Sequence, residues 1–280
     1  MQDKLIDIEK VIASKNPSLL KWSPSFLINY LKRILHQEEI NQIIWEHQDK
    51  SGYNFAKAIV EHFKLDLHCF GKENIPKDGG FIFACNHPLG GMDAMALIEE
   101  IYPIRPDMKF IVNDILLNVK PLEEFFVGVN KHGSTAARSL SKVNELFASD
   151  QAIFVFPAGL VSRKTKGKVR DLEWKKTFIT RAKRFDKPVI PVYLDGKLSS
   201  FFYGLANFRK GIGIKANIEM LYLVNELFKQ KNERIEIHFG KAIPANHFDS
   251  NKSDLEWAQE VKEACYALAN NKIVKRWVKI

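Results

Sequence analysis

The chain has 280 residues, of which 46% are hydrophobic and 11% aromatic, and its formal net charge is +9. This composition allows a sizeable core, and no apolar run reaches the roughly 20 residues that a membrane-spanning helix needs. The three cysteines, Cys69, Cys85 and Cys265, form no CxxC pair and predict a reduced, cytoplasmic setting. The charged stretch after Met1 predicts that there is no signal peptide. The positive charge fits anionic lipid, nucleic acid, an acidic carrier protein or plain solubility.

Residues 3–63 have the pattern of successive helices. Apolar residues between Leu27 and Leu35 recur at helical spacing, and Ser23-Pro24 is a helix-start signal. Ser51-Gly52 predicts a break. We therefore expect an N-terminal helical extension over residues 1–65.

From about residue 66, short apolar runs alternate with helical stretches, which predicts an α/β fold. We expect a mixed, largely parallel sheet covered by helices, forming one domain over residues 66–280. The expected strands are Leu67–Phe70, Phe81–Cys85, Lys109–Val112, Phe125–Val129, Ala152–Phe156, Val189–Tyr193 and Ile235–Phe239. The expected helices are Met92–Ile101, Thr135–Phe147, Trp174–Arg184, Ile218–Phe228 and Leu255–Ala269.

The most informative segment is Cys-Asn-His-Pro-Leu-Gly-Gly-Met-Asp at residues 85–93. It places His87 just past a buried strand and Asp93 beyond a turn, where a carboxylate can hold one ring nitrogen and leave the other free to take a proton. The amides of Gly90 and Gly91, near a helix start, are candidate donors to an oxyanion. The alternative is a structural histidine, with Asp93 merely favouring the helix N-terminus.

A second constellation begins at Phe156-Pro157-Ala158-Gly159, another turn at a strand end. A basic cluster follows it, which predicts a site for a phosphate or carboxylate, although most charge runs are only solvated loops. The residues of this cluster are Arg163, Lys164, Lys166, Lys168 and Arg170.

Two weaker segments complete the set. Gly128-Val129-Asn130-Lys131 would bring Asn130 and Lys131 to the same sheet edge if its strand is parallel. Lys187-Pro188-Val189-Ile190-Pro191-Val192 contains two prolines, which restrict a strand to a sheet edge or place them at a strand start. We expect this segment to shape a pocket wall.

In this order and spacing, the four segments resemble the four motifs of the glycerolipid/lysophospholipid acyltransferase family, in its bacterial hemolysin-like branch of amino-lipid O-acyltransferases. The resemblance covers roughly residues 66–245. It implies transfer of a fatty acyl group from acyl carrier protein or acyl-CoA to the hydroxyl of a lyso-lipid, such as a lyso-amino lipid or lysophosphatidic acid.

The resemblance also implies roles for individual residues. His87 matches the catalytic base and Asp93 its partner, while Asn130 and Lys131 fall where the family has an Asp-Arg pair near the acceptor's phosphate. The third motif, which contacts the acceptor, covers Phe156, Pro157, Ala158, Gly159, Ser162, Arg163 and the adjoining Lys164. Pro191 matches the fourth.

The chain departs from the family pattern at two sites. Five residues rather than four separate His87 from Asp93, and we expect Gly90-Gly91 to absorb the extra residue. Ala158 replaces a glutamate and Lys131 an arginine, which favours an acceptor other than glycerol phosphate.

The reaction implied by the resemblance needs no bound cofactor and no metal. The aromatic and basic residues around Phe201–Lys210 and Lys275–Lys279 suit the interface of an anionic leaflet, or they pack on the domain instead. We expect a peripheral enzyme on the cytoplasmic face of the inner membrane. An acyl-cysteine route through Cys85 is conceivable, but a buried structural cysteine is the favoured interpretation.

Three rival functions remain. The first is a lipid hydrolase, but this chain has no GxSxG nucleophile elbow. The second is a Rossmann dehydrogenase, because the glycines of Gly211–Ala216 fit a loose dinucleotide fingerprint, but no clean strand precedes them. A non-enzymatic binder of anionic lipid or nucleic acid is allowed by the charge, but no nucleic-acid recognition motif is present, so we expect no nucleic-acid partner.

Overall fold

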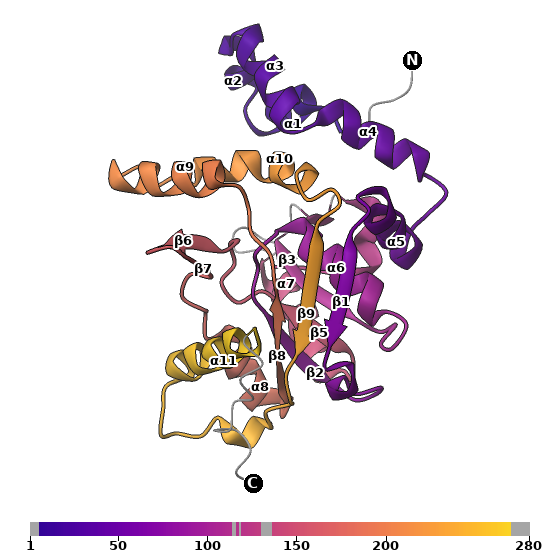
Figure 1. Ribbon diagram of the computed structural model, residues 1–280, viewed down its shortest axis with the longest axis vertical. Helices are drawn as coiled ribbons and strands as arrows, with labels where there is room; N and C mark the ends of the chain where they lie inside the picture. The colour runs from indigo at the N-terminus through magenta and orange to yellow at the C-terminus, as the bar shows by residue number, and fades with distance from the viewer. Residues whose placement is uncertain (1–5, 114–115, 118, 130–135, 270–280) are drawn as a thin grey trace. The chain divides into compact units, whose positions relative to one another are not determined.

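The computed structural model describes residues 6–113, 116–117, 119–129 and 136–269 (Figure 1). The chain divides into two compact units, each assembled from two stretches of sequence. The first, here called the helical unit, comprises Met1–Lys50 and Leu198–Lys231. The second, here called the sheet unit, comprises Ser51–Lys197 and Asn232–Ile280.

The helical unit joins N-terminal helices to helices from a distant part of the chain. The ring of His36 stacks on Phe228 at 4.1 Å, and its Nε2 donates to Oδ1 of Asn225 at 2.9 Å. The hydroxyls of Tyr30 and Tyr222 form a further hydrogen bond. Its elements are α1 (Ile8–Lys15), α2 (Pro17–Trp22), α3 (Ser25–Ile34), α4 (Gln37–Glu46), α9 (Ser200–Gly211), η4 (Ile218–Tyr222) and α10 (Leu223–Phe228).

The sheet unit is built on a seven-stranded sheet with the order β1-β9-β8-β2-β5-β3-β4. All neighbouring strands are parallel except β8 and β9, which are antiparallel. The prediction of a mixed, largely parallel sheet is therefore confirmed. The strands are β1 (Asp66–Phe70), β2 (Phe81–Cys85), β3 (Lys109–Asn113), β4 (Phe126–Val129), β5 (Ala152–Val155), β8 (Val189–Leu194) and β9 (Arg234–Phe239).

Helices cover the sheet because the chain crosses it in both directions. The connection from β2 to β3 runs toward the β4 edge of the sheet. The connections from β4 to β5 and from β5 to β8 run toward the β1 edge. Since parallel crossovers are right-handed, helices on these two paths lie on opposite faces. The helices are α5 (Gly52–His62), α6 (Gly91–Ile101), α7 (Ala136–Ala148), α8 (Thr177–Phe185) and α11 (Asp254–Leu268), with short turns η1 (Lys72–Asn74), η3 (Lys120–Phe125) and η5 (Ala245–His247).

The core follows the alternation of side chains along the strands. Ile82 and Ala84 of β2 belong to the apolar cluster that α7, α8 and α11 cover. Phe83, between them in sequence, stacks on Phe154 at 4.4 Å, and Phe110 lies 5.1 Å from Phe154. Strands that are apolar on both sides are the expected signature of a sheet covered on both faces.

Pro191 corrects one prediction. It lies in the middle of β8, a central strand between β9 and β2, and not at an edge or a strand start. The ladder to β9 ends with the pair Val192–Phe239, and the Pro191 carbonyl accepts from the N–H of Gly240 at 2.9 Å. A proline is tolerated here because the antiparallel ladder does not continue through its missing N–H.

The strand order has a switch point at the carboxyl ends of β2 and β5. These strands are parallel neighbours, yet the helices that follow them, α6 and α8, lie on opposite faces. Open α/β sheets bind ligands at such a switch point, where the departing connections leave a gap. Residues directly after β2 and β5 are therefore placed for chemistry.

Candidate active site

Asn86 anchors the turn that follows β2. Its side-chain Nδ2 donates to the carbonyl of Leu194 at 2.8 Å, and its Oδ1 accepts from the N–H of Leu194 at 2.7 Å. The side chain thus replaces the next rung of the β2–β8 ladder with two hydrogen bonds. This fixes the point at which the chain leaves the sheet, one residue before His87.

His87 and Asp93 meet across that turn. Nδ1 of His87 lies 2.9 Å from Oδ2 of Asp93, which is completely buried, while the His87 side chain is 20% exposed. The shared proton belongs to Nδ1 if the carboxylate is ionised, and this sets the tautomer in which Nε2 carries the lone pair. Among the described residues, Nε2 has no hydrogen-bond partner, so it can accept a proton from a bound molecule.

The five-residue spacing is accommodated by a left-handed glycine. Gly90 has φ of +71° and immediately precedes α6, in which Asp93 is the third residue. Oδ2 of Asp93 also accepts from the N–H groups of Leu89 and Gly90, at 3.0 and 3.1 Å. The carboxylate therefore holds both the loop and the imidazole.

Burial has an electrostatic consequence for Asp93. Desolvation raises the pKa of its carboxyl, and the hydrogen bonds from His87 and the Leu89 N–H act in the opposite direction. Its second oxygen, Oδ1, has no hydrogen-bond partner among the described residues. A protein interior retains such a costly group only where other forces hold it in place.

The same contacts separate the two predicted oxyanion donors. The Gly90 N–H is already directed at Asp93. Gly91 is exposed and is the first residue of α6, where backbone amides have no intrahelical acceptor. Of the two candidates, the Gly91 amide is therefore the one open to a ligand.

The turn after β5 lies against the imidazole. Phe156 stacks on the His87 ring with centroids 4.2 Å apart and an angle of 27°. The Gly159 N–H donates to the Phe156 carbonyl at 3.0 Å and closes the turn, with Gly159 at φ of +68°. The Pro157 carbonyl accepts from the N–H of Lys175 at 3.1 Å. The Ala158 side chain is buried.

The chain then enters a basic hairpin, with β6 (Arg163–Thr165) antiparallel to β7 (Lys168–Arg170). Lys164, Lys166 and Lys168 are exposed on it. Arg163 is buried instead, and its Nη1 donates to the carbonyl of Val161 at 2.6 Å. The hairpin was not predicted; of the predicted basic cluster it exposes the three lysines, while Arg163 is buried and Arg170 pairs with Glu263.

Ser162 is completely buried, and its hydroxyl donates to Oδ1 of Asp171 at 2.6 Å. Its own N–H donates to the His87 carbonyl at 2.8 Å. Sequence reasoning missed Asp171, because the hairpin separates it from the motif and no spacing rule points to it. Asn130 and Lys131, which follow β4, lie outside the described residues.

Two smaller predictions can be checked directly. Cys85 is fully buried, and desolvation raises the pKa of its thiol well above the ordinary value, which suits a structural residue and not a nucleophile. Gly211 is the last residue of the helix α9 and Gly213 follows it, so no strand precedes these glycines. The dinucleotide fingerprint therefore lacks its structural context.

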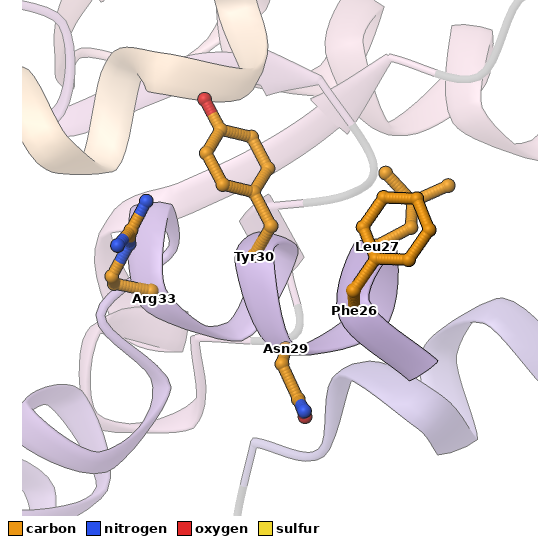
Figure 2. Close-up of a pocket in the computed structure, with 5 residues that line it drawn as sticks. All are labelled: Phe26, Leu27, Asn29, Tyr30 and Arg33. Atoms are coloured by element: carbon orange, nitrogen blue, oxygen red, sulfur yellow. The ribbon is translucent and has the colours of Figure 1, made fainter. Parts of the chain in front are cut away.

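The helical unit carries an open cavity of 540 Å³ that is lined by residues of α3 (Figure 2). Several large apolar side chains of this unit are exposed: Phe26 at the cavity is 75% exposed, and outside it Trp22 is 83% and Phe208 65% exposed. No helix among the described residues is long and apolar enough to cross a bilayer. The cavity is lined by Phe26, Leu27, Asn29, Tyr30 and Arg33.

The chain resembles known proteins over nearly its whole length. The model of the Acyltransferase family matches residues 10–274. The lyso-glycine lipid O-acyltransferase of Bacteroides thetaiotaomicron is 43% identical over 267 residues, covering 94% of this chain and 97% of that protein. The enzyme of the same name from Phocaeicola vulgatus is 40% identical over 267 residues, covering 94% and 95%.

Among solved structures, the 1-acyl-sn-glycerophosphate acyltransferase PlsC of Thermotoga maritima aligns with a TM-score of 0.49 and 19% identity, over 94% of this chain and 98% of that one. The family match and the two curated relatives each span nearly the whole chain. This protein therefore belongs to the Acyltransferase family.

Proposed function

We propose that the protein transfers a fatty acyl group from a thioester donor to the hydroxyl of a lyso-lipid. The observation that carries the proposal is the His87–Asp93 pair, with Nε2 open, in a chain 43% identical to a lyso-glycine lipid O-acyltransferase. A lyso-glycine lipid or a related lyso-amino lipid is the first candidate acceptor. Lysophosphatidic acid is the second.

The chemistry follows from the ring nitrogens. Nε2 of His87 takes the proton of the acceptor hydroxyl while the hydroxyl oxygen attacks the thioester carbonyl. Asp93 stabilises the imidazolium that forms. The tetrahedral intermediate collapses with cleavage of the C–S bond, and the imidazolium returns its proton to the departing sulfur. The products are an ester and a free thiol, and His87 is restored.

The oxyanion of the intermediate needs a hydrogen-bond donor near His87. The amide of Gly91 at the start of α6 is suited to this, because it is exposed and the helix dipole favours negative charge there. The Gly90 amide supports the dyad instead. The role proposed for this pair of glycines is thus divided between them.

The turn and the hairpin after β5 are proposed to bind the anionic parts of the substrates. Phe156 borders the imidazole, Gly159 closes the same turn, and Lys164, Lys166 and Lys168 follow on the hairpin. Acyl carrier protein and acyl-CoA both carry phosphate, and a lyso-glycine lipid carries a carboxylate. Lysine ammonium groups pair with either anion.

We also propose that the helical unit attaches the enzyme to an anionic membrane surface on the cytoplasmic side. Trp22, Phe26 and Phe208 are exposed there beside basic residues such as Lys21 and Lys210. Aromatic and cationic side chains together bind the interface of a charged leaflet without spanning it. A lyso-lipid acceptor is found at that interface.

The test is a transfer assay with purified protein, labelled acyl carrier protein or acyl-CoA, and a panel of lyso-lipids. The panel contains a lyso-glycine lipid, lyso-ornithine lipid and lysophosphatidic acid, and release of free fatty acid is measured in parallel. Ester formation that depends on His87 supports the proposal and identifies the acceptor. Release of free fatty acid with no ester from any acceptor would contradict the proposal and show that the protein is a hydrolase.

A further inference from the structure

Asp171 is a buried carboxylate at the end of the basic hairpin, outside every segment that the sequence marked as functional. Its side chain accepts three hydrogen bonds. Oδ1 accepts from the N–H of His87 at 3.2 Å and from the hydroxyl of Ser162 at 2.6 Å. Oδ2 accepts from the indole Nε1 of Trp174 at 2.8 Å. A buried carboxylate with this many donors is held in one orientation.

These contacts tie down the backbone of His87 from two directions. Its N–H donates to Asp171, and its carbonyl accepts from the N–H of Ser162 at 2.8 Å. Its ring is held separately by Asp93. One carboxylate therefore fixes the imidazole and a second fixes the main chain that carries it, so the direction of Nε2 depends on both.

The helix α11 holds Asp171 in turn. The Asp171 N–H donates to the hydroxyl of Tyr266 at 2.7 Å, and Nζ of Lys262 donates to the Asp171 carbonyl at 2.8 Å. Both residues project from a helix that packs on β8 and β2 in the core. The carboxylate is thus built on a rigid element, which is what precise positioning of a reacting group requires.

We infer that Asp171 is a positioning residue: it sets the backbone of His87, and so the aim of Nε2, through its contacts with the turn after β2 and the segment after β5. It does not act as a second base, since neither oxygen contacts the imidazole ring. The inference rests on the proposed function for its meaning, because the group it positions is the proposed base.

The test compares Asp171→Asn with the wild type and with Glu263→Gln. The asparagine oxygen can keep the bonds to His87 and Ser162, but its NH2 group faces the indole N–H, donor against donor. Glu263→Gln is a matched control, because Glu263 binds Arg170 on the same segment at 2.8 Å without touching Asp171. All assays are run well below each melting temperature, so that the folded fraction does not limit the rate.

We expect kcat of Asp171→Asn to fall on the order of 10- to 100-fold, as for other small misplacements of a reacting group. KM for donor and acceptor should change less than about twofold, since Asp171 contacts neither. Trp174→Phe removes the opposing donor, so the double variant should be no slower than Asp171→Asn alone. Glu263→Gln should leave kcat within about twofold of the wild type. Both limits, on KM of Asp171→Asn and on kcat of Glu263→Gln, are expected because each substitution alters only its immediate contacts.

An unchanged kcat in Asp171→Asn, or a loss that disappears well below the melting temperature, overturns the inference. If that variant does not fold, Ser162→Ala decides instead, with a lower kcat at constant KM expected and an unchanged kcat contradicting it. A readout independent of activity is the ¹⁵N NMR spectrum of the His87 ring. Asp171→Asn should shift it and Glu263→Gln should not, so the inference can fail even where wild-type activity is absent. A wild type inactive on every acceptor would instead refute the proposed function.

Discussion

At the scale of single residues, Asp93 combines two properties that are usually opposed. It is completely buried, and it is the group that orients the proposed base. One oxygen accepts three hydrogen bonds, and the other has no partner among the described residues. The buried charge lowers the stability of the fold but supports the proposed chemistry. A mutation that removes the charge should therefore affect stability and catalysis in opposite directions.

Asp93→Asn should separate the effect of this charge on catalysis from its effect on stability. An amide oxygen at the position of Oδ2 can still accept from the loop N–H groups and from Nδ1 of His87, but a neutral amide cannot stabilise the imidazolium. In the serine-protease triad this change lowers kcat by about 10⁴-fold, and we expect a loss on the order of 10³- to 10⁴-fold here. The unfolding midpoint at neutral pH should be equal or higher. A variant that keeps its transfer rate would show that Asp93 does not orient the base.

The raised pKa of Asp93 also predicts how stability varies with pH. Between its ordinary value and the raised value, the folded state holds a proton that the unfolded state has released. The free energy of unfolding must therefore fall as pH rises through that window. Urea unfolding of the wild type and Asp93→Asn across this range should give the smaller negative slope for the variant. Equal slopes would contradict the assignment.

At the scale of elements, the apolar strands were predictable and the polar hairpin was not. All seven strands of the main sheet were predicted near their observed bounds, because most are apolar runs and β9 alternates apolar with polar residues. β6 and β7 have three residues each and are rich in lysine, so they carry no apolar alternation. The helix α9 was missed, since its aromatic and basic residues were interpreted only as a surface.

The candidate site shows the same limit. The motif around His87 and Asp93 predicted two groups that the structure brings together. Asp171 could not be predicted because most of its partners lie far from it in sequence: His87 after β2, Ser162 after β5, and Lys262 and Tyr266 on α11. Asn86 was assigned only to a turn, since nothing in the sequence shows that its side chain pairs with Leu194. The roles of Asn130 and Lys131 remain predictions.

Asn86→Ala tests how the element that carries His87 is anchored. The substitution leaves the buried N–H and carbonyl of Leu194 without partners, which should cost on the order of 2–4 kcal/mol. Denaturant unfolding measures this directly. Asn251→Ala, whose side chain bonds only the nearby Asp249 among the described residues, is the control and should change stability by less than about 0.5 kcal/mol. Equal effects would show that the anchor contributes nothing.

At the scale of the whole molecule, the two units suggest a division of labour. The sheet unit holds the dyad, and the helical unit holds most of the strongly exposed aromatic side chains. A net charge of +9 adds attraction to an anionic surface without contributing to the chemistry. Membrane binding and catalysis should therefore respond to different mutations.

A triple substitution of Trp22, Phe26 and Phe208 by serine tests this division. It should lower binding to vesicles of phosphatidylglycerol and phosphatidylethanolamine by more than about tenfold, since each aromatic group contributes roughly 1.5–3 kcal/mol when buried. Leu140→Ser, an exposed apolar residue of the sheet unit, is the control. Co-sedimentation measures both. Unchanged binding of the triple variant would assign membrane attachment elsewhere.

The proposed mechanism depends on His87 as the base. The most direct measurement is the rate of ester formation on a lyso-glycine lipid by the wild type and by His87→Ala, at equal concentrations of folded protein. General-base catalysis contributes about 10²- to 10⁴-fold, so the variant should lose at least that factor while keeping its fold and its vesicle binding. A His87→Ala protein that still forms the ester at the wild-type rate would contradict the account.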